Sequence, residues 1–250
     1  AESAIQKLET GNAPFRQLRL DDNGSFLSYY PSLIETEPVF PEEKLNSLME
    51  QLLLEPGGPN TVIPWSQGRL KVYGKEHMER RFTCFFADAT DKVYSYSGRK
   101  DLKVNSWTDP QVCPPILKDL RNYISALCGC QFDTALLNFY RDGEDCIGWH
   151  ADDEAIYGGK SDAKSIVGVS FGAEREFQIR PKPSKRNPPQ PISKSRDKLS
   201  ITLRSGSVIV MGGAMQQHWQ HSVPPRKRVS SPRVSVTFRK VSSFADTTLP

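Results

Sequence analysis

Three side chains in the sequence have the type and spacing of a metal site. His150 and Asp152 are separated by one residue, and in an extended segment residues i and i+2 point to the same side. His221 follows 71 residues after His150, where another strand of the same barrel could present it. Two histidines and one carboxylate form the facial triad of non-haem Fe(II) oxygenases. An H-x-D pair also arises by chance, so this interpretation depends on support elsewhere in the chain.

Residues 233–239 supply that support. Apolar and polar side chains alternate there, so the pattern predicts a strand on which Arg233, Thr237 and Arg239 share the polar face with Ser235. At about 3.3 Å per residue, the two arginine Cα atoms lie roughly 20 Å apart. Inward-leaning guanidinium groups could hold the two ends of a short dicarboxylate, with Thr237 between them. The alternative is a solvated sheet face, and the combination with the triad favours the binding role.

Hydrophobic periodicity predicts the elements that must position these residues. Residues 41–54 and 114–129 carry apolar side chains at helical spacing; the first segment stops at the proline–glycine break of residues 56–59, and the second closes near Gly129. After Gln131 the period changes to two, which predicts strands. The predicted strands are residues 135–140, 166–171, 175–179, 199–203, 207–211 and 233–239. Many short strands without intervening helices predict an antiparallel sandwich or jelly roll.

Positive charge is concentrated in the C-terminal third of the chain. The net charge is +4, but positions 180 to 240 hold fourteen Lys and Arg against one acid, Asp197, and the remainder is acidic overall. Such a stretch suggests a polyanion partner. Residues 180–198, which are rich in proline and basic side chains, should form an exposed loop. A merely solubilising loop is the alternative, although solvated surfaces ordinarily intersperse both signs of charge.

Membrane and disulfide-stapled proteins are excluded by composition. No segment approaches the roughly 18 apolar residues of a membrane span, and residues 1–4 show no signal-peptide pattern. We therefore expect a soluble, intracellular monomer. The five cysteines are odd in number and form no C-x-x-C pair, so reduced thiols are expected. A zinc site at Cys128 and Cys130 would need a second pair at finger spacing, which the sequence lacks.

Taken as a set, these motifs resemble the AlkB family of Fe(II)/2-oxoglutarate dioxygenases over roughly residues 60–241. The resemblance implies an α+β fold, with a double-stranded β-helix (jelly roll) core, flanking N-terminal helices and a nucleotide-recognition lid. It implies that the catalytic and Fe(II)-binding residues are His150, Asp152 and His221. It implies that 2-oxoglutarate, with O₂ as cosubstrate, is bound by Asn138, Tyr140, Arg233, Thr237 and Arg239.

The same resemblance divides the chain into four parts. Residues 1–60 would form an N-terminal extension with a helix, and residues 61–130 the lid with a support helix. Residues 131–241 would form the catalytic core, and residues 242–250 a tail.

Within the family the chain is most similar to the eukaryotic duplex-DNA repair type. Residues 72–75, which include Tyr73, Gly74 and Lys75, resemble a hairpin whose aromatic tip fills the gap left by a flipped base. Tyr94, Ser95 and Tyr96 resemble a lid segment that stacks on that base. Asp153 falls where the family places a carboxylate that hydrogen-bonds the base edge, and Glu154 is the alternative for that role. Extruding a base costs a few kcal/mol, and stacking contacts return about 1–3 kcal/mol per base.

Phosphate contacts would come from the basic stretch. Such contacts give affinity that depends on salt but not on sequence. The candidate residues are Arg180, Lys182, Lys185, Arg186, Lys194, Arg196, Lys198, Arg226, Lys227 and Arg228. The last three could also belong to a nuclear-import signal, so a nuclear location is expected.

The predicted activity is oxidative demethylation of N-alkylated bases, of the 1-methyladenine and 3-methylcytosine type, in DNA, with double strands favoured. The methyl group would be hydroxylated and released as formaldehyde. A demethylase of RNA or single-stranded nucleic acid is the first alternative, and a catalytically silent nucleic-acid-binding jelly roll is the second. A protein or lipid oxygenase would leave the basic stretch unexplained.

Overall fold

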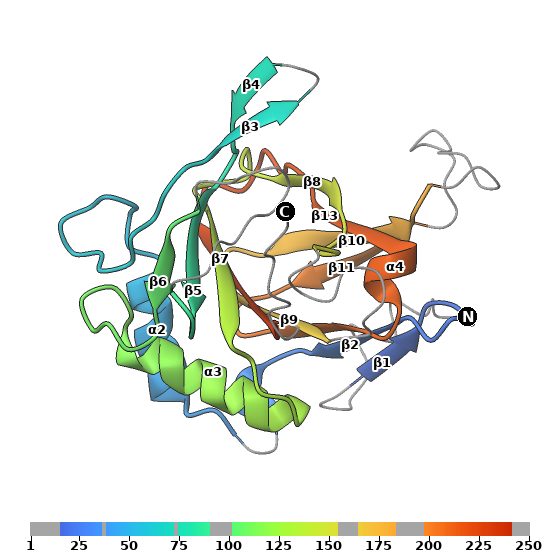
Figure 1. Ribbon diagram of the computed structural model, residues 1–250, viewed down its shortest axis with the longest axis horizontal. Coiled ribbons are helices and arrows are strands. Elements are labelled where there is room, and N and C mark those ends of the chain that lie inside the picture. The colour runs from blue at the N-terminus through green and yellow to red at the C-terminus, as the bar shows by residue number, and fades with distance from the viewer. Residues whose placement is uncertain are drawn as a thin grey trace, which may run out of the picture.

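The computed structural model describes residues 16–36, 39–72, 75–90, 102–154, 165–183 and 198–241. Within them two mainly antiparallel sheets, one large and one small, enclose a pocket, and helices cover the outer side of the large sheet (Figure 1). This arrangement confirms the predicted α+β fold with a jelly-roll core.

The large sheet contains eight strands. In spatial order they are β1 (Arg16–Arg19), β2 (Phe26–Tyr30), β12 (Val208–Gly212), β9 (Ile166–Gly172), β14 (Arg233–Arg239), β7 (Thr134–Tyr140), β5 (Phe82–Ala87) and β6 (Val104–Ser106). β14 lies at the centre and pairs antiparallel with β7 and β9, so that Arg233 lies opposite both Tyr140 and Gly172. β14 is therefore held between two neighbours, which fixes the face on which each side chain lies.

The small sheet carries the two histidines of the candidate triad. Its spatial order is β11 (Leu199–Leu203), β10 (Arg175–Pro181), β13 (Trp219–Val223) and β8 (Ile147–His150). A short helix, α4 (Met215–His218), leads into β13. In the β13–β8 pair His221 lies directly opposite His150, so two residues far apart in sequence become neighbours on one face.

Two helices pack on the outer face of the large sheet. They are α2 (Glu42–Leu52) and α3 (Pro115–Cys128), with a 3₁₀ turn η1 (Leu33–Glu35) before them. α3 has proline at its start and ends at Gly129, whose φ of 59° suits glycine at a helix C-terminus. Their apolar faces bury Val234, Val236 and Phe238 of β14. Both predicted helices are confirmed, and no described helix is long and apolar enough to cross a membrane.

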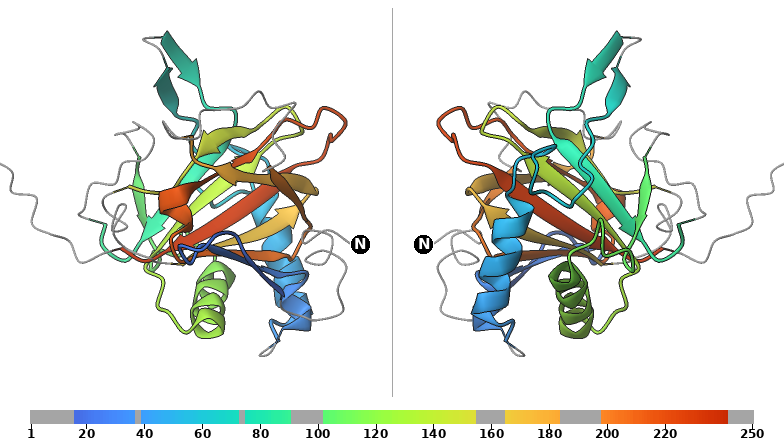
Figure 2. Two further views of the ribbon diagram at one scale, coloured as in Figure 1. Left: turned by 90° about the vertical axis from the view of Figure 1, so that its right-hand side faces the viewer. Right: turned by 90° about the vertical axis from the view of Figure 1, so that its left-hand side faces the viewer.

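A two-stranded hairpin projects from the molecule at the end away from α2 and α3 (Figure 1, Figure 2). Its strands are β3 (Arg69–Val72) and β4 (Lys75–Met78), and Val72 pairs with Lys75. The hairpin inferred from residues 72–75 is therefore present, with Lys75 at the start of β4. Tyr73 and Gly74 at its tip lie outside the described residues.

All six predicted strands are present, but the strand predictions were incomplete. β1 and β2 come from the segment assigned to an N-terminal extension, and β2 pairs with β12 to extend the large sheet. β8 and β13, which carry the two histidines, were not predicted as strands from hydrophobic periodicity. Arg180 lies within β10 rather than in the predicted loop, most of which lies outside the described residues.

Candidate active site

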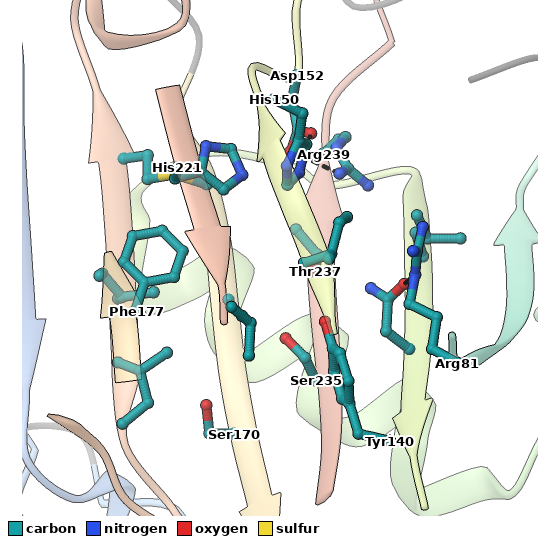
Figure 3. A pocket seen from close by; sticks show the side chains of 18 of the residues that line it. Arg81, Tyr140, His150, Asp152, Ser170, Phe177, His221, Ser235, Thr237 and Arg239 are labelled. Atoms are coloured by element: carbon teal, nitrogen blue, oxygen red, sulfur yellow. Dashed lines mark hydrogen bonds and ion pairs between the residues drawn. The ribbon is translucent and has the colours of Figure 1, made fainter. Parts of the chain in front are cut away.

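The pocket between the two sheets has a volume of about 870 Å³, including its open mouth. Polar side chains from β14, β7 and β8 face it, and apolar side chains from β10, β11 and β12 complete its walls. Figure 3 shows His150, Asp152 and Arg239 gathered at one end of the pocket, whereas Tyr140, Ser170 and Ser235 lie toward the other. The pocket thus has charges of both signs at one end, whereas at the other end hydroxyl groups lie beside the guanidinium of Arg233.

The three candidate iron ligands meet at the end of the pocket that holds Arg239. One ligand atom from each of His150, Asp152 and His221 lies within 4.8 Å of the others, and the two imidazole ring centres are 4.1 Å apart. Asp152 lies two residues after the end of β8, and its Oδ1 is 3.6 Å from His150 Nε2. The triad inferred from spacing is therefore assembled, and no other such group of His, Cys, Asp or Glu occurs in the described parts of the chain.

Electrostatics keep the three ligands in the protonation states that a divalent metal requires. Burial lowers the pKa of His221 to about 3 and also lowers the pKa of His150. Burial would raise the pKa of Asp152, but the positive charge of Arg239 and the two neighbouring imidazoles outweigh it, so the pKa is lowered. At neutral pH the site presents two neutral imidazoles and one carboxylate.

Hydrogen bonds from neighbouring residues orient His150 and Asp152. His150 Nδ1 lies 2.9 Å from the carbonyl oxygen of Gly148, which can only accept, so Nδ1 donates and Nε2 keeps its lone pair. Arg239 Nη2 donates to Asp152 Oδ2 at 2.6 Å, and Gln216 Oε1 accepts from the Asp152 backbone N–H at 2.9 Å. His221 Nδ1 is buried without a hydrogen-bond partner among the described residues. These donor atoms fit a divalent metal.

The predicted 2-oxoglutarate residues line the same pocket, although they do not all act as expected. Arg233 is 1 % exposed and donates from Nη2 to Ser170 Oγ at 2.9 Å, while its Nε and Nη1 have no acceptor in the described structure. Such unmet donors fit a carboxylate ligand. Arg239 instead contacts Asp152, and Asn138 Oδ1 accepts from Arg81 Nε at 2.8 Å. Arg233 is therefore the clearest candidate for binding the distal carboxylate.

Several residues of the pocket were missed from the sequence. Arg81 lines it, is 4 % exposed, and forms a buried ion pair with Glu79 at 2.9 Å. A charged pair at i and i+2 directly before the apolar run of β5 was the available signal, since buried charges are normally paired. Ser170 and Phe177 also line the pocket, and the pleat of strands β9 and β10 places them there. Ser235 lines it from the polar face of β14, as the alternation of residues 233–239 predicted.

The two carboxylates considered for base recognition are placed differently. Asp153 accepts from Lys182 Nζ at 2.8 Å and does not line the pocket. Glu154 does line it, and burial raises the pKa of this side chain to about 7, with the charge of Asp152 adding to the effect. Of the two, Glu154 faces the pocket in this conformation. Tyr94, Ser95 and Tyr96 lie outside the described residues.

The predicted phosphate-binding residues divide into three groups. Arg180 lies over the ring of Trp149, 4.3 Å from its centre, and Lys182 pairs with Asp153, while Lys198 is half-buried. Residues 226–228 are exposed in the loop after β13. The third group, Lys185, Arg186, Lys194 and Arg196, lies outside the described residues. His218 is exposed at the end of α4 and takes no part in the metal cluster.

A jelly-roll pocket with two histidines and one carboxylate at its end defines a non-haem Fe(II) oxygenase. The model of the 2OG-Fe(II) oxygenase superfamily matches residues 27–239. DNA oxidative demethylase ALKBH2 of Arabidopsis thaliana is 35 % identical over 252 residues, which cover 95 % of this chain and 73 % of the relative.

Human ALKBH2 is 37 % identical over 69 % of this chain, and human alkB homolog 3, an alpha-ketoglutarate-dependent dioxygenase, is 32 % identical over 72 % of it. This chain spans about three-fifths of the length of each human relative. The chain belongs to the AlkB family within the 2OG-Fe(II) oxygenase superfamily. Its cofactors are accordingly Fe(II) and 2-oxoglutarate, and its activity is that of a dioxygenase.

Proposed function

We propose that this protein demethylates N-alkylated bases in DNA, of the 1-methyladenine and 3-methylcytosine type. The observation that carries the proposal is a single pocket with His150, Asp152 and His221 at one end and the buried, incompletely bonded Arg233 in its wall. The similarity to proteins named DNA oxidative demethylases supports the substrate class.

When bound, Fe(II) with 2-oxoglutarate and O₂ oxidises the methyl group, with succinate, CO₂ and formaldehyde as products. The chain's own residues hold and orient these groups. His150, Asp152 and His221 supply the metal ligands, and Arg239 keeps the Asp152 carboxylate ionised and in place. Arg233 binds the distal carboxylate of 2-oxoglutarate, supported by Ser170. The apolar walls exclude water from the reacting face.

The remaining cosubstrate contacts follow from the residues that line the pocket. Asn138, Tyr140, Thr237 and Arg239 all face it and would contact 2-oxoglutarate along its length. The ring of Tyr140 lies 5.3 Å from the Arg233 guanidinium carbon, which places a phenol beside the carboxylate site.

Base recognition would combine a wedge, a stacking residue and a carboxylate. Tyr73 at the tip of the β3–β4 hairpin would fill the vacated stack, and Tyr96 would stack on the flipped base. Glu154, which lines the pocket, would contact the cationic base. Asp153 would do so only after the base displaced Lys182, which donates a hydrogen bond to it. The exposed basic residues 226–228 would bind phosphates. A monomer acting in the nucleus on double-stranded DNA fits these features.

Loss of the metal ligands tests the activity. Replacing His150 or Asp152 with Ala should abolish 2-oxoglutarate-dependent demethylation of an oligonucleotide that bears one 1-methyladenine, measured by formaldehyde release. Lys118→Ala, on α3 behind the large sheet, should retain full turnover. Undiminished turnover in the ligand variants would contradict the assignment.

The wedge discriminates between double-stranded and single-stranded substrates, because single strands have no stack to fill. Tyr73→Ala should reduce turnover on the duplex and leave turnover on the matched single strand unchanged. If both activities stayed the same, the preference for double-stranded DNA would lose its main support, and the single-stranded alternative would be favoured.

A further inference from the structure

The loop between β7 and β8, residues 141–146, is joined to the exposed basic loop after β13 by two short backbone hydrogen bonds. The Gly143 N–H donates to the Val229 carbonyl at 2.7 Å, and the Arg226 N–H donates to the Gly143 carbonyl at 2.7 Å. These bonds enclose Lys227 and Arg228, whose side chains are exposed, as is that of Arg226. One glycine thus fixes both ends of the basic segment.

The contact is so close that a side chain at position 143 would collide with it. A Cβ atom there would lie 1.8 Å from the Arg226 carbonyl oxygen and 2.9 Å from that of Val229. Both are backbone atoms, which cannot rotate away as the end of a flexible side chain does. Gly143 does not have a positive φ, so close approach, rather than backbone conformation, requires glycine here.

A buried arginine, Arg175, hydrogen-bonds to the backbone of both loops. Arg175 is 1 % exposed and donates to the carbonyl oxygens of Asp142 at 3.0 Å and Asp145 at 2.7 Å. It also donates to the carbonyl of Pro224 at 2.7 Å, directly before the basic loop. A guanidinium group has enough donors in a fixed plane to reach all three acceptors, which a lysine cannot match.

The same β7–β8 loop also contacts the chain that follows the β3–β4 hairpin. The Cys146 N–H donates to the Arg80 carbonyl at 2.9 Å, and Arg80 Nη2 lies 3.1 Å from Glu144 Oε2. The hairpin and the loop after β13 project at the same end of the molecule (Figure 2). The β7–β8 loop therefore lies between the two segments that the proposed function assigns to DNA.

We propose that Gly143 and Arg175 are positioning residues for nucleic-acid binding, which hold the basic loop in its phosphate-binding conformation before DNA arrives. The proposal rests on the proposed function for its ligand. A loop that is already ordered loses less conformational entropy on binding, so bracing increases affinity without adding a contact. Neither residue lines the pocket. The Arg175 guanidinium lies 5.6 Å from the ring of Tyr140, whereas the backbone bonds of Gly143 go to the basic loop, so cosubstrate turnover should be independent of Gly143 and serves as the control there.

The test measures binding of a fluorescein-labelled duplex with one 1-methyladenine to the Fe(II)- and 2-oxoglutarate-loaded enzyme, without O₂, across a salt series. Gly143→Ala should raise Kd about tenfold and reduce the slope of log K against log salt by about 1 to 3, one for each phosphate that the loop no longer neutralises. Uncoupled succinate formation without DNA should remain at the wild-type rate. Lys118→Ala on α3 should change neither Kd nor slope.

A variant with Arg226, Lys227 and Arg228 all changed to Ala allows a double-mutant cycle with Gly143→Ala. In that background Gly143→Ala should produce no further loss of affinity, because both changes act on the same phosphate contacts. Arg175→Lys keeps the charge but loses carbonyl bonds, and should lower the slope partway. If uncoupled turnover shows that Gly143→Ala misfolds, the Arg175→Lys comparison decides alone.

Three results would overturn the positioning role: an unchanged slope in Gly143→Ala, an unchanged slope in Arg175→Lys, or fully additive losses in the cycle. Wild-type enzyme that binds the duplex but does not demethylate it would refute the proposed function and leave the positioning role intact. Wild-type enzyme that binds no duplex would overturn the positioning role.

Discussion

Arg239 and Arg233 have the same side chain and lie on the same face of β14, yet they have different partners. Arg239 donates to Asp152 at 2.6 Å and so belongs to the metal end of the pocket. Arg233 contacts Ser170, and two of its nitrogens lack an acceptor in the described structure. A fully buried cation with unmet donors is costly unless an anion completes it. The site is therefore built to be completed by its cosubstrate.

Replacing Arg233 tests this division. Charge-assisted hydrogen bonds contribute about 1.5–3 kcal/mol each, so Arg233→Met should raise the KM for 2-oxoglutarate roughly tenfold to hundredfold. The KM for methylated DNA should stay close to the wild-type value, since the residue lies in the cosubstrate region. Steady-state kinetics with each substrate varied separately make the measurement. An unchanged KM for 2-oxoglutarate would assign the carboxylate to another residue.

At the level of elements, the sequence predicted what depends on local periodicity. β14 was predicted with the correct faces because Val234, Val236 and Phe238 alternate with polar residues, and the helix over residues 115–128 because its apolar residues repeat at helical spacing. β8 and β13 lack this signal, since Ile147–His150 contains an exposed glycine and, in Trp219–Val223, the polar His221 interrupts the face that Trp219 and Val223 share.

The candidate site follows the same rule. His150 and Asp152 could be paired from spacing alone. The local Glu79–Arg81 pair signals a buried charge, but the pocket that Arg81 lines is set by the β5–β7 pairing, which the local pattern does not reveal. The ion pair between Asp153 and Lys182 likewise depends on contact between two segments that are far apart in the sequence. Apart from His150 and His221, which the set of motifs indicated, the side chains that tertiary pairing brings together are the part of the site that the sequence did not predict.

β2 makes the N-terminal segment part of the core. Leu27 is 0 % exposed and packs with Met211 and other residues between the sheets. Truncating such a side chain leaves a cavity, so Leu27→Ala should lower the free energy of unfolding by about 2–5 kcal/mol. Urea denaturation followed by circular dichroism measures the change. Val62→Ala, at a half-exposed site, should stay within about 0.5 kcal/mol of wild type.

The β7–β8 loop should respond to acid through Asp145. Burial raises the pKa of this carboxyl, but hydrogen bonds from the Arg141 backbone and guanidinium outweigh it, and the pKa is lowered. A depressed folded-state pKa contributes stability that is complete above the unfolded value of about 3.9 and is lost as pH falls below it.

Asp145→Asn should therefore be less stable than wild type at pH 7, and the difference should shrink as the pH falls below about 4. Urea unfolding from pH 7 to pH 3 tests this, with Glu50→Gln on the exposed face of α2 as the control. A constant difference at every pH would show that the carboxylate charge contributes nothing.

For the molecule as a whole, the metal joins elements that the chain connects only distantly. Its ligands come from β13 and from the end of β8, and Arg239 of the large sheet contacts one of them. A ligand that binds only the folded state stabilises it by about 2.7 kcal/mol at a hundred times its Kd. Mn(II), which takes the same ligands without oxidation chemistry, should raise the Tm of the wild type.

The matched control is Asp152→Ala, which lacks one ligand and should show a much smaller rise in Tm with Mn(II). Differential scanning calorimetry over a range of metal concentrations gives the shift. An equal rise in both proteins would place the stabilising metal elsewhere.

The central position of β14 bears on which mutations this fold can tolerate over evolutionary time. Seven consecutive residues of the strand pair with β7, and six of them also pair with β9. Substitutions on the helix side can exchange one apolar residue for another, but a single inserted or deleted residue would reverse every side chain beyond it. Arginines would then enter the helix-packed layer and valines the pocket. Changes in chain length should therefore accumulate in the connecting loops, whereas within β14 only substitutions should persist.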